Sequence, residues 1–487
     1  MPNAFAYIAL FAYPLLAGWL FKRLSLPSAL IWTLLLGYLL LPERTQVDFP
    51  MLPTLDKNSI PSLSAMLFCW LRMREAGRVR GVLNASGPAN ARLMAAGPIA
   101  DTTKPLAQKS RLIGLLIVLF ILGPLMTVYT NREAVFFGDR GIRGLEWYDG
   151  FSMILSSIIT VIPFVLARRH LASKEGLESL LTALAIAGGA YSLLVLFEIR
   201  MSPQLHNWVY GFHPHSFLQQ KRGDGFRAMV FTQHGLKVAL FLAVACVSAI
   251  SLGFLKQGEQ AKRWRWLGLW LLIVLILQKS LGALLIVIPM AALTIICKPG
   301  VRVAVVAAVV ATILLYPMLR GAGLIPVEAI TEFSRSIDAE RAGSLVYRLV
   351  NEDILLSRAE EKPLFGWGGW ARGRVFNERG QDISVTDGLW VIVIGENGWL
   401  GYITTFGLWC LPALIIARRR SQLRTMLFVP ASVATLLTIT LVDFIPNSGI
   451  PMLSWFLAGA LLGWTEAYSN QKQVPAANAK PLRLSSV

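Results

Sequence analysis

The residues best suited to chemistry lie in one short stretch, "PLFGWGGWARGR", from Pro363 to Arg374. A guanidinium group is planar and makes bidentate, charge-assisted contacts to phosphate. Indole rings offer flat apolar faces to sugar rings, and glycines let the backbone turn close to a ligand. Besides its glycines, the stretch holds two tryptophans and two arginines: Trp367, Trp370, Arg372 and Arg374. This combination predicts a binding site for a phosphorylated carbohydrate.

Two more arginines precede this stretch on a segment with helical periodicity. Arg341, Ser344 and Arg348 are three and four residues apart, so on a helix they share one face. A second interpretation stays open, in which the arginines pair with nearby acids and the tryptophans only anchor a turn. The acids available for such pairs are Glu340, Glu352, Asp353, Glu360 and Glu361.

The composition indicates that these residues belong to a membrane protein. Of the 487 residues, 55% are hydrophobic and only 15% are charged, and the mean hydropathy is +0.57. Repeated apolar runs match the roughly 20 residues that cross a bilayer. We predict one all-α polytopic integral membrane domain over residues 1–487, with about 12 to 14 transmembrane helices. The thirteen expected spans are 3–21, 26–42, 60–72, 112–129, 150–167, 176–197, 229–251, 265–278, 280–297, 303–319, 388–416, 425–443 and 449–467.

One apolar run, residues 267–297, allows two interpretations. It forms either one long tilted helix or a hairpin of two spans that turns at Gln278 to Ser280. A single helix would place the later basic cluster "ARRRSQLR" on the opposite side from the other clusters, against the positive-inside rule. We therefore expect the hairpin. The first run has neither a basic segment before it nor a cleavage site after it, so it predicts a span and not a signal peptide.

Lysine and arginine clusters predict the orientation. The loop 72–111 carries eight basic residues, and "ARRHLASK", "KQGEQAKRWRW", "KPGVR" and "ARRRSQLR" fall on the same side of the predicted spans. That side is expected to be cytoplasmic, which puts the N-terminus outside and a flexible tail, 468–487, inside. We attribute the net charge of +18 to loops beside anionic lipid headgroups and not to nucleic-acid binding.

Two long loops are expected on the outer face. They are residues 199–228 and residues 320–387, and the second contains the candidate site. Their aromatic and apolar content argues against disorder. The four cysteines, Cys69, Cys246, Cys297 and Cys410, stand singly without metal-ligand spacing. We predict neither a metal site nor a cofactor.

The order of motifs in the second half of the chain resembles a known family. "RAMVFTQHGLKVALF" is followed by the hairpin "LQKSLGALL", then by "SLVYRL" and "KPLFGWGGW" in the large loop, and then by "TDGLWVIVIGENGWLG". Over about residues 225–445 this succession resembles the O-antigen ligase and Wzy-type polymerase family of bacterial envelope glycosyltransferases. The resemblance implies a GT-C-like membrane bundle with a large, partly helical extracytoplasmic loop.

Six residues match the family's pattern of charged and turn residues, and three of them, Pro363, Gly366 and Gly368, belong to the "PLFGxG" turn. Arg227 and His234 stand at the places of an arginine and a His-Pro-Asn-like turn that opens a helix, with Gly235 where proline is common. Arg348 matches the arginine before the "PLFGxG" turn.

Two places depart from the family. Asp387 and Gly388 replace its histidine and asparagine, and the Ser-Arg-Gly of its hairpin appears as "SLG" beside Lys279, a substitute charge. An aspartate still accepts a proton, although its pKa differs from that of histidine.

The family resemblance implies a glycan donor linked to undecaprenyl diphosphate in the bacterial cytoplasmic (inner) membrane. Negative charge develops on the phosphate as it leaves, and the chain has no Asp-x-Asp pair for a metal. The implied mechanism is therefore metal-independent transfer on the outer face. Asp387 acts as general base, and Arg227, Arg341 and Arg348 hold the diphosphate. The remaining expected substrate contacts are His234, Lys279, Trp367, Trp370, Arg372 and Arg374.

Simpler roles stay open for three of these residues. Arg227 at the mouth of a span can simply reach the interface. His234 can be a polar helix contact, although ionisable groups within membranes are functional by default. Asp387 can be a helix N-cap.

The acceptor decides between polymerase and ligase, and both stay open. A growing chain makes the protein a polymerase, whereas a lipid or a protein makes it a ligase. A chain-length regulator or export proteins are the expected partners. Two further functions are a transporter or flippase for lipid-linked glycan, for which paired broken helices are typical, and a non-catalytic component of an export complex.

Overall fold

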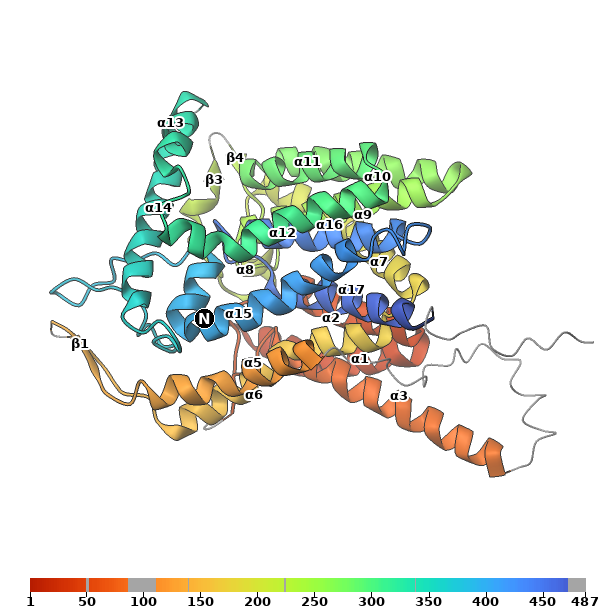
Figure 1. Cartoon of the computed structure of the whole chain (residues 1–487), viewed down its shortest axis with the longest axis horizontal. Coiled ribbons are helices and arrows are strands. Elements are labelled where there is room, and N and C mark those ends of the chain that lie inside the picture. The colour runs from red at the N-terminus through yellow and green to blue at the C-terminus, as the bar shows by residue number, and fades with distance from the viewer. Residues whose placement is uncertain (50–51, 86–110, 139, 223–224, 338, 472–487) are drawn as a thin grey trace, which may run out of the picture.

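The computed structural model describes residues 1–49, 52–85, 111–138, 140–222, 225–337 and 339–471. This part of the chain is a helical bundle with two small β-hairpins (Figure 1). One hairpin joins β1 (Val135–Phe137) to β2 (Arg140–Ile142), and the other joins β3 (Lys221–Arg222) to β4 (Gly225–Phe226). Residues 86–110 of the expected loop 72–111, and residues 472–487 of the expected tail, lie outside the described residues.

Thirteen helices in the described residues coincide one by one with the thirteen predicted spans. Seven are long and apolar enough to cross a membrane, and α2, α11 and α16 are shorter apolar helices. The chain is thus helical and consistent with an all-α polytopic membrane protein, as predicted. The thirteen are α1 (Ala4–Arg23), α2 (Leu26–Leu40), α3 (Ser59–Ala85), α5 (Arg111–Tyr129), α6 (Trp147–His170), α7 (Lys174–Met201), α9 (Gly235–Leu255), α10 (Gly258–Leu277), α11 (Leu281–Ile296), α12 (Pro299–Gly321), α15 (Leu389–Arg418), α16 (Phe428–Asp443) and α17 (Pro451–Gln471).

The connections between these helices lie at two ends of the bundle. One end, which we call the loop end, carries both hairpins, the short helix α8 (Leu205–Tyr210), and the helix pair α13 (Val327–Ile337) and α14 (Ala339–Glu360), all on the left of Figure 1. The opposite end, which we call the basic end, carries the connections α6–α7, α9–α10, α11–α12 and α15–α16. The four basic clusters in these connections therefore share one end, as predicted.

The predicted turn at residues 278–280 is confirmed, because α10 ends at Leu277 and α11 begins at Leu281. Lys279 in the turn has a φ of 54°. Three helix bounds differ from the prediction by six residues or more, and one of them is the start of α10, at Gly258 and not at 265. Helix α9 begins at Gly235 and not at 229, because residues 228–234 form a non-helical turn, and α3 continues to Ala85 beyond the predicted end at 72.

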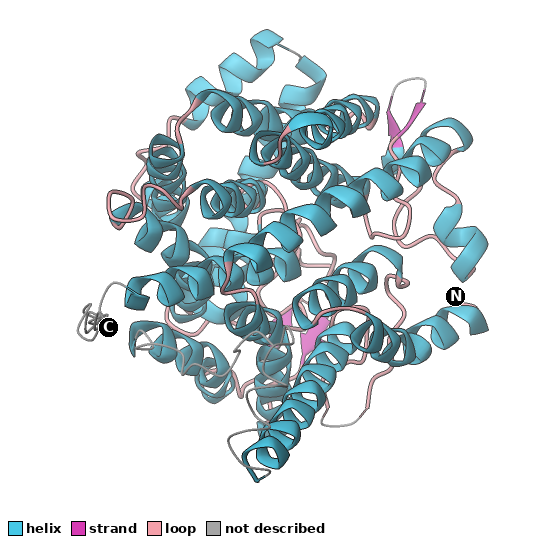
Figure 2. Ribbon diagram, turned by 90° about the vertical axis from the view of Figure 1, so that its right-hand side faces the viewer, coloured by secondary structure: helices cyan, strands magenta, loops and turns pink. Residues whose placement is uncertain are grey.

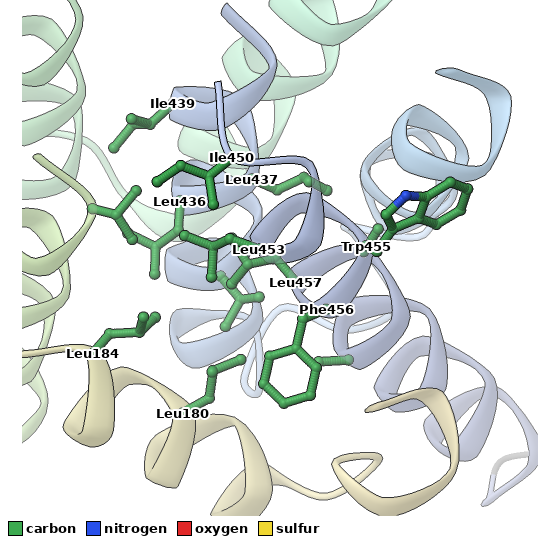
Figure 3. Close-up of a cluster of buried hydrophobic side chains, with 14 of the residues drawn as sticks. Leu180, Leu184, Leu436, Leu437, Ile439, Ile450, Leu453, Trp455, Phe456 and Leu457 are labelled. Atoms are coloured by element: carbon green, nitrogen blue, oxygen red, sulfur yellow. The ribbon is translucent and has the colours of Figure 1, made fainter. Parts of the chain in front are cut away.

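Helix α9 is the centre of the bundle. It is apolar on all sides and almost entirely buried, as expected for a helix surrounded by others, and it packs against α7, α10, α11 and α16. Figure 2, viewed from the basic end, shows the helices packed together with strands in only two small places. Figure 3 shows part of the core, where Leu436 of α16 and Phe456 of α17 meet Leu180 and Leu184 of α7. This packing fixes the loop ends of α9 and α16 beside each other.

The outward faces of the bundle are apolar as well. Large apolar side chains are exposed on α1, α5, α7 and α11, for example Leu15, Leu115, Leu193 and Leu285. Extended apolar surface of this kind is rare on soluble monomers and is typical of a membrane contact.

Candidate functional site

The structure brings Arg348 and Asp387 together at the loop end. Arg348 lies on α14, Asp387 precedes α15, and Arg348 Nε is 3.3 Å from Asp387 Oδ2. Arg348 Nη1 also donates to Asn447 Oδ1 at 3.3 Å, and Asn447 Nδ2 donates to Asp443 Oδ1 at 2.8 Å. The side chains of Arg348 and Asp387 remain 28% and 36% exposed. We call these four residues the arginine site.

Asp387 does not cap helix α15. The N-cap is Gly388, and no side chain bonds to the first turn of the helix. The backbone N–H of Leu389 bonds instead to the carbonyls of Phe444 and Asn447, at 2.9 and 3.1 Å. The Asp387 carboxylate is therefore committed to the partly exposed ion pair with Arg348, and the simpler role of N-cap does not apply.

A second group of predicted residues surrounds the turn 228–234. Arg227 Nη2 donates to the carbonyl of Lys279 at 3.2 Å, and the stem of Arg227 occupies the space that a Cβ on Gly235 would need, at 2.4 Å. A side chain at position 235 would collide with Arg227, so glycine is the residue that fits there. Lys279 extends toward the β3–β4 hairpin, where its Nζ would lie 2.8 Å from a Cβ on Gly225.

His234 is the N-cap of α9. Its Nδ1 accepts a hydrogen bond from the backbone N–H of Leu236 at 3.1 Å. Its ring also meets the ring of His215 edge to face, with 5.0 Å between the centroids. His234 thus has a structural task at the helix start and does not lie one turn inside a span.

Buried Glu198 of α7 holds the turn 228–234 in place. Its Oε2 accepts the backbone N–H groups of Met229 and Val230 at 2.8 and 2.7 Å, and its Oε1 accepts that of Leu205 at 2.9 Å. Val230 has a φ of 50°, which is a strained conformation for a β-branched residue. Strain of this kind persists only where the surroundings impose it, and it gathers at functional sites.

A buried ion pair supports the same turn from the other side. Lys57 and Glu43 lie 3.1 Å apart; Lys57 Nζ donates to the carbonyl of Phe231 at 2.7 Å, and Glu43 Oε1 accepts the N–H of Gln233 at 3.1 Å. Burial would raise the pKa of Glu43, but Lys57 and Lys237 outweigh it and hold that pKa below its usual value. The sequence prediction missed this pair because its members lie at two helix ends far from the turn in sequence.

Lys237 connects the two groups and was not predicted. It lies in the first turn of α9, its Nζ donates to Gln233 Oε1 at 3.0 Å, and its charge acts on the carboxylates of Glu43 and Asp443. The charge of Arg348 acts on Asp443 as well. Hydrogen bonds link Asp443 to the α14 side, through Asn447 and Arg348, whereas its link to Lys237 is electrostatic. The sequence signal that could have identified Lys237 is its position, three residues after His234 at the start of an apolar helix.

Glu352 lies one helical turn beyond Arg348 on α14. Its side chain is buried, with Trp390 Nε1 donating at 3.4 Å and the Tyr316 hydroxyl at 3.5 Å. Burial raises the pKa of Glu352 to about 7. No arginine pairs with it among the described side chains, in contrast to its neighbour Asp353, which lies 2.7 Å from Arg320.

The tryptophan and glycine stretch fills a break in helix α15. Gly398 has a φ of 66° and a ψ of −169° inside α15, a conformation open almost only to glycine. The segment 363–368 lies along the break and forms a ladder of backbone hydrogen bonds. The four bonds run from Trp367 N to Gly395 O, Gly368 N to Glu396 O, Trp399 N to Pro363 O and Leu400 N to Leu364 O, at 2.8, 2.8, 2.8 and 3.2 Å.

Two residues of this stretch that were predicted to bind a ligand are buried and bond to backbone carbonyls of the protein instead. Trp367 is buried, donates from Nε1 to the carbonyl of Arg358 at 2.7 Å, and has the Arg358 guanidinium 3.6 Å from its ring centroid. Arg372 is 1% exposed. Its guanidinium donates to the carbonyls of Trp367, Arg143 and Glu133 at 3.2, 2.6 and 3.0 Å. We leave both residues out of the proposed site.

The other residues of the predicted site remain at the surface. Trp370 is 56% exposed. Arg374 pairs with Asp382 at 2.5 Å and donates to the Thr386 hydroxyl at 3.3 Å, next to Asp387. Arg341 belongs to α14, but its side chain lies outside the described part of the structure.

Within the described residues, no three His, Cys, Asp or Glu side chains gather as a metal ion would require. No protein-family model matches the chain, and no curated protein matches it.

Proposed function

We propose that this chain is a membrane glycosyltransferase that transfers a glycan from an undecaprenyl-diphosphate donor to an acceptor, either as a polymerase or as a ligase. The observation that favours it is the partly exposed Arg348–Asp387 pair at the loop end, which Asn447 links to Asp443. The order of motifs resembling the O-antigen ligase and Wzy-type polymerase family supports the same proposal.

The proposed orientation follows from the charges. The basic end faces the cytoplasm of a bacterial cell because lysine and arginine loops stay there, and the loop end faces outward. Cysteine labelling from outside should then reach Trp370→Cys and not Ser421→Cys, with each residue substituted alone. Labelling of position 370 only from the cytoplasm would overturn both the orientation and the site.

Arg348 would bind the leaving diphosphate. Its guanidinium has the fork geometry that matches phosphate, and it is partly open to solvent. Phosphate on Arg348 competes with the Asp387 carboxylate, because both are anions that seek the same donors. Donor binding would therefore release Asp387 from its ion pair at the moment when a base is needed.

Asp387 would take the proton of the acceptor. The acceptor oxygen attacks the anomeric carbon, the bond from that carbon to the phosphate oxygen breaks, and the proton of the hydroxyl passes to the carboxylate. The electron pair of the broken bond stays on the diphosphate, where Arg348, Arg227 and Lys237 offset its charge. Glu352 is the next candidate for the base, because it lies one turn from Arg348 and is poised near neutrality.

A transporter of lipid-linked glycan is the second candidate, favoured by the break in α15 at Gly398. Broken helices are typical of transporter sites. Here, however, the segment 363–368 bonds to the backbone groups on either side of the break, so these groups are not left for a substrate. This favours the enzyme.

One experiment separates the two functions. Purified protein in vesicles is given lipid-linked glycan extracted from its own host cells, and both released undecaprenyl diphosphate and glycan movement across the bilayer are measured. We expect release of undecaprenyl diphosphate together with a glycan joined to a new acceptor. Movement of intact lipid-linked glycan without release would establish the transporter instead.

A further inference from the structure

Helix α13 exposes its apolar residues. Leu324, just before the helix, is 69% exposed, and Ile330 and Phe333 are 42% and 68% exposed. The polar side of the helix carries Glu328 and Arg335. Such a strongly two-sided helix normally buries its apolar side against something.

The neighbouring helix α14 does not cover this side. α13 packs against α14, and the less exposed positions Val327, Thr331 and Ser334 recur at the helical period that marks one face. At 3.6 residues per turn, Ile330 and Phe333 lie to one side of that face. The apolar strip of α13 thus has no partner among the described residues.

The position of α13 indicates what covers the strip. It follows α12, whose exposed residues Leu315 and Met318 belong to the apolar outer surface of the bundle. Leu324 and Ile330 are the next exposed large apolar residues along the chain after Met318. Figure 1 shows α13 at the far edge of the loop end, above α14 and away from the other helices. An amphipathic helix that continues a lipid-facing surface fits the interface plane of the bilayer.

We propose that α13 lies on the outer surface of the bilayer, with Ile330 and Phe333 inserted among the upper acyl chains and Glu328 and Arg335 facing water. This anchor holds α14 at a fixed height above the membrane. The inference does not depend on the proposed reaction, since it rests only on exposure and placement.

Spin labels on the two sides of α13 test the proposal. Cys297 is replaced by serine, because it is the only one of the four cysteines that is not buried. Labels are placed singly by Phe333→Cys and, as the matched control two residues away on the other side, by Arg335→Cys. The full chain is reconstituted in vesicles of phosphatidylethanolamine and phosphatidylglycerol. Relaxation by oxygen, which gathers in acyl chains, is compared with relaxation by a water-soluble nickel chelate.

We expect the ratio of oxygen to nickel relaxation to be several-fold higher at position 333 than at position 335. Equal ratios at the two positions would overturn the proposal, because they would place both sides of the helix in water. Strong dipolar broadening between labels at position 333 would overturn it as well, since it would show that a second copy of the chain covers the strip. Dilution with unlabelled protein distinguishes this case, because it removes broadening between copies and leaves lipid contact unchanged.

Discussion

Two parts of the loop end contain the same kinds of residues but use them differently. In the stretch 363–374, Trp367 and Arg372 are buried and bond to backbone carbonyls. In the arginine site, Arg348 and Asp387 bond to each other and stay partly open to solvent. A guanidinium that suits phosphate suits a cluster of carbonyls equally well. Residue type therefore identifies candidates, whereas exposure and partners decide which of them are free to meet a ligand.

The largest effect is expected at Asp387. Asparagine at this position keeps the shape of the side chain and removes the proton acceptor, so Asp387→Asn should lower glycan transfer by about 100-fold to 10,000-fold. The melting temperature should hardly change, because a half-exposed ion pair contributes about 0 to 1 kcal/mol. Turnover is measured with purified protein and lipid-linked donor. Near-normal turnover would shift the role of base to Glu352.

Substitution of Arg372 should have the opposite effect: it should lower the stability of the fold and not the chemical step of glycan transfer. Arg372→Gln offers two N–H donors on a shorter side chain, so one or more of the three carbonyls are left without a donor, and each buried unsatisfied group costs about 1 to 3 kcal/mol. We expect unfolding to become easier by roughly 3 to 5 kcal/mol, measured by denaturation in detergent. The matched control is Arg379→Gln, an exposed residue of the same loop. Unchanged stability together with lost donor binding would return Arg372 to the list of ligands.

Glu352 should make stability depend on pH. Its pKa is raised by burial to about 7 in the folded protein, above an unfolded value near 4.3, so the folded state holds the proton more tightly. The contribution of Glu352 to the free energy of unfolding is fully present below about pH 4. As the pH rises toward 7, this contribution is lost, and the free energy of unfolding falls by up to about 3 kcal/mol. Glu352→Gln should remove this part of the pH dependence. Identical pH profiles for the two proteins would refute the raised pKa.

Lys237 should have the smallest effect of this set. Lys237→Gln removes one of several positive charges near Asp443, so binding of undecaprenyl diphosphate should weaken by about 10-fold, in the range of one charged hydrogen bond. The affinity is measured in nanodiscs at two salt concentrations. An unchanged affinity at low salt would show that Lys237 does not contribute to binding, and it would leave Arg348 on α14 as the binding charge.

Most of the fold could be predicted from the sequence because apolar run length and basic clusters report directly on membrane helices. The hairpin at 278–280 was correctly placed for this reason. The start of α9 was placed too early because the turn 228–234 begins with four apolar residues. What makes it a turn is distant in sequence: Glu198 bonds to its N–H groups, and Lys57 to one of its carbonyls.

The candidate site was only partly predictable. Arg348 and Asp387 were chosen from motif positions, and the structure joins them. Trp367 and Arg372 were chosen by residue type. Trp367 bonds to the carbonyl of Arg358, and Arg372 bonds to those of Arg143 and Glu133, and no local sequence pattern displays these contacts. Lys237 was missed because a lysine at the start of an apolar helix resembles an ordinary interfacial charge.

The most direct test of the arginine site is the affinity of nanodisc-embedded protein for undecaprenyl diphosphate, compared among wild type, Arg348→Lys and Arg379→Lys. Lysine at position 348 keeps the charge but loses the bidentate fork, so we expect affinity to fall by about 10-fold to 100-fold. Arg379→Lys should bind as wild type does, and all three proteins should melt at the same temperature. Wild-type affinity in folded Arg348→Lys would contradict the account, because it would reduce Arg348 to an ordinary surface charge.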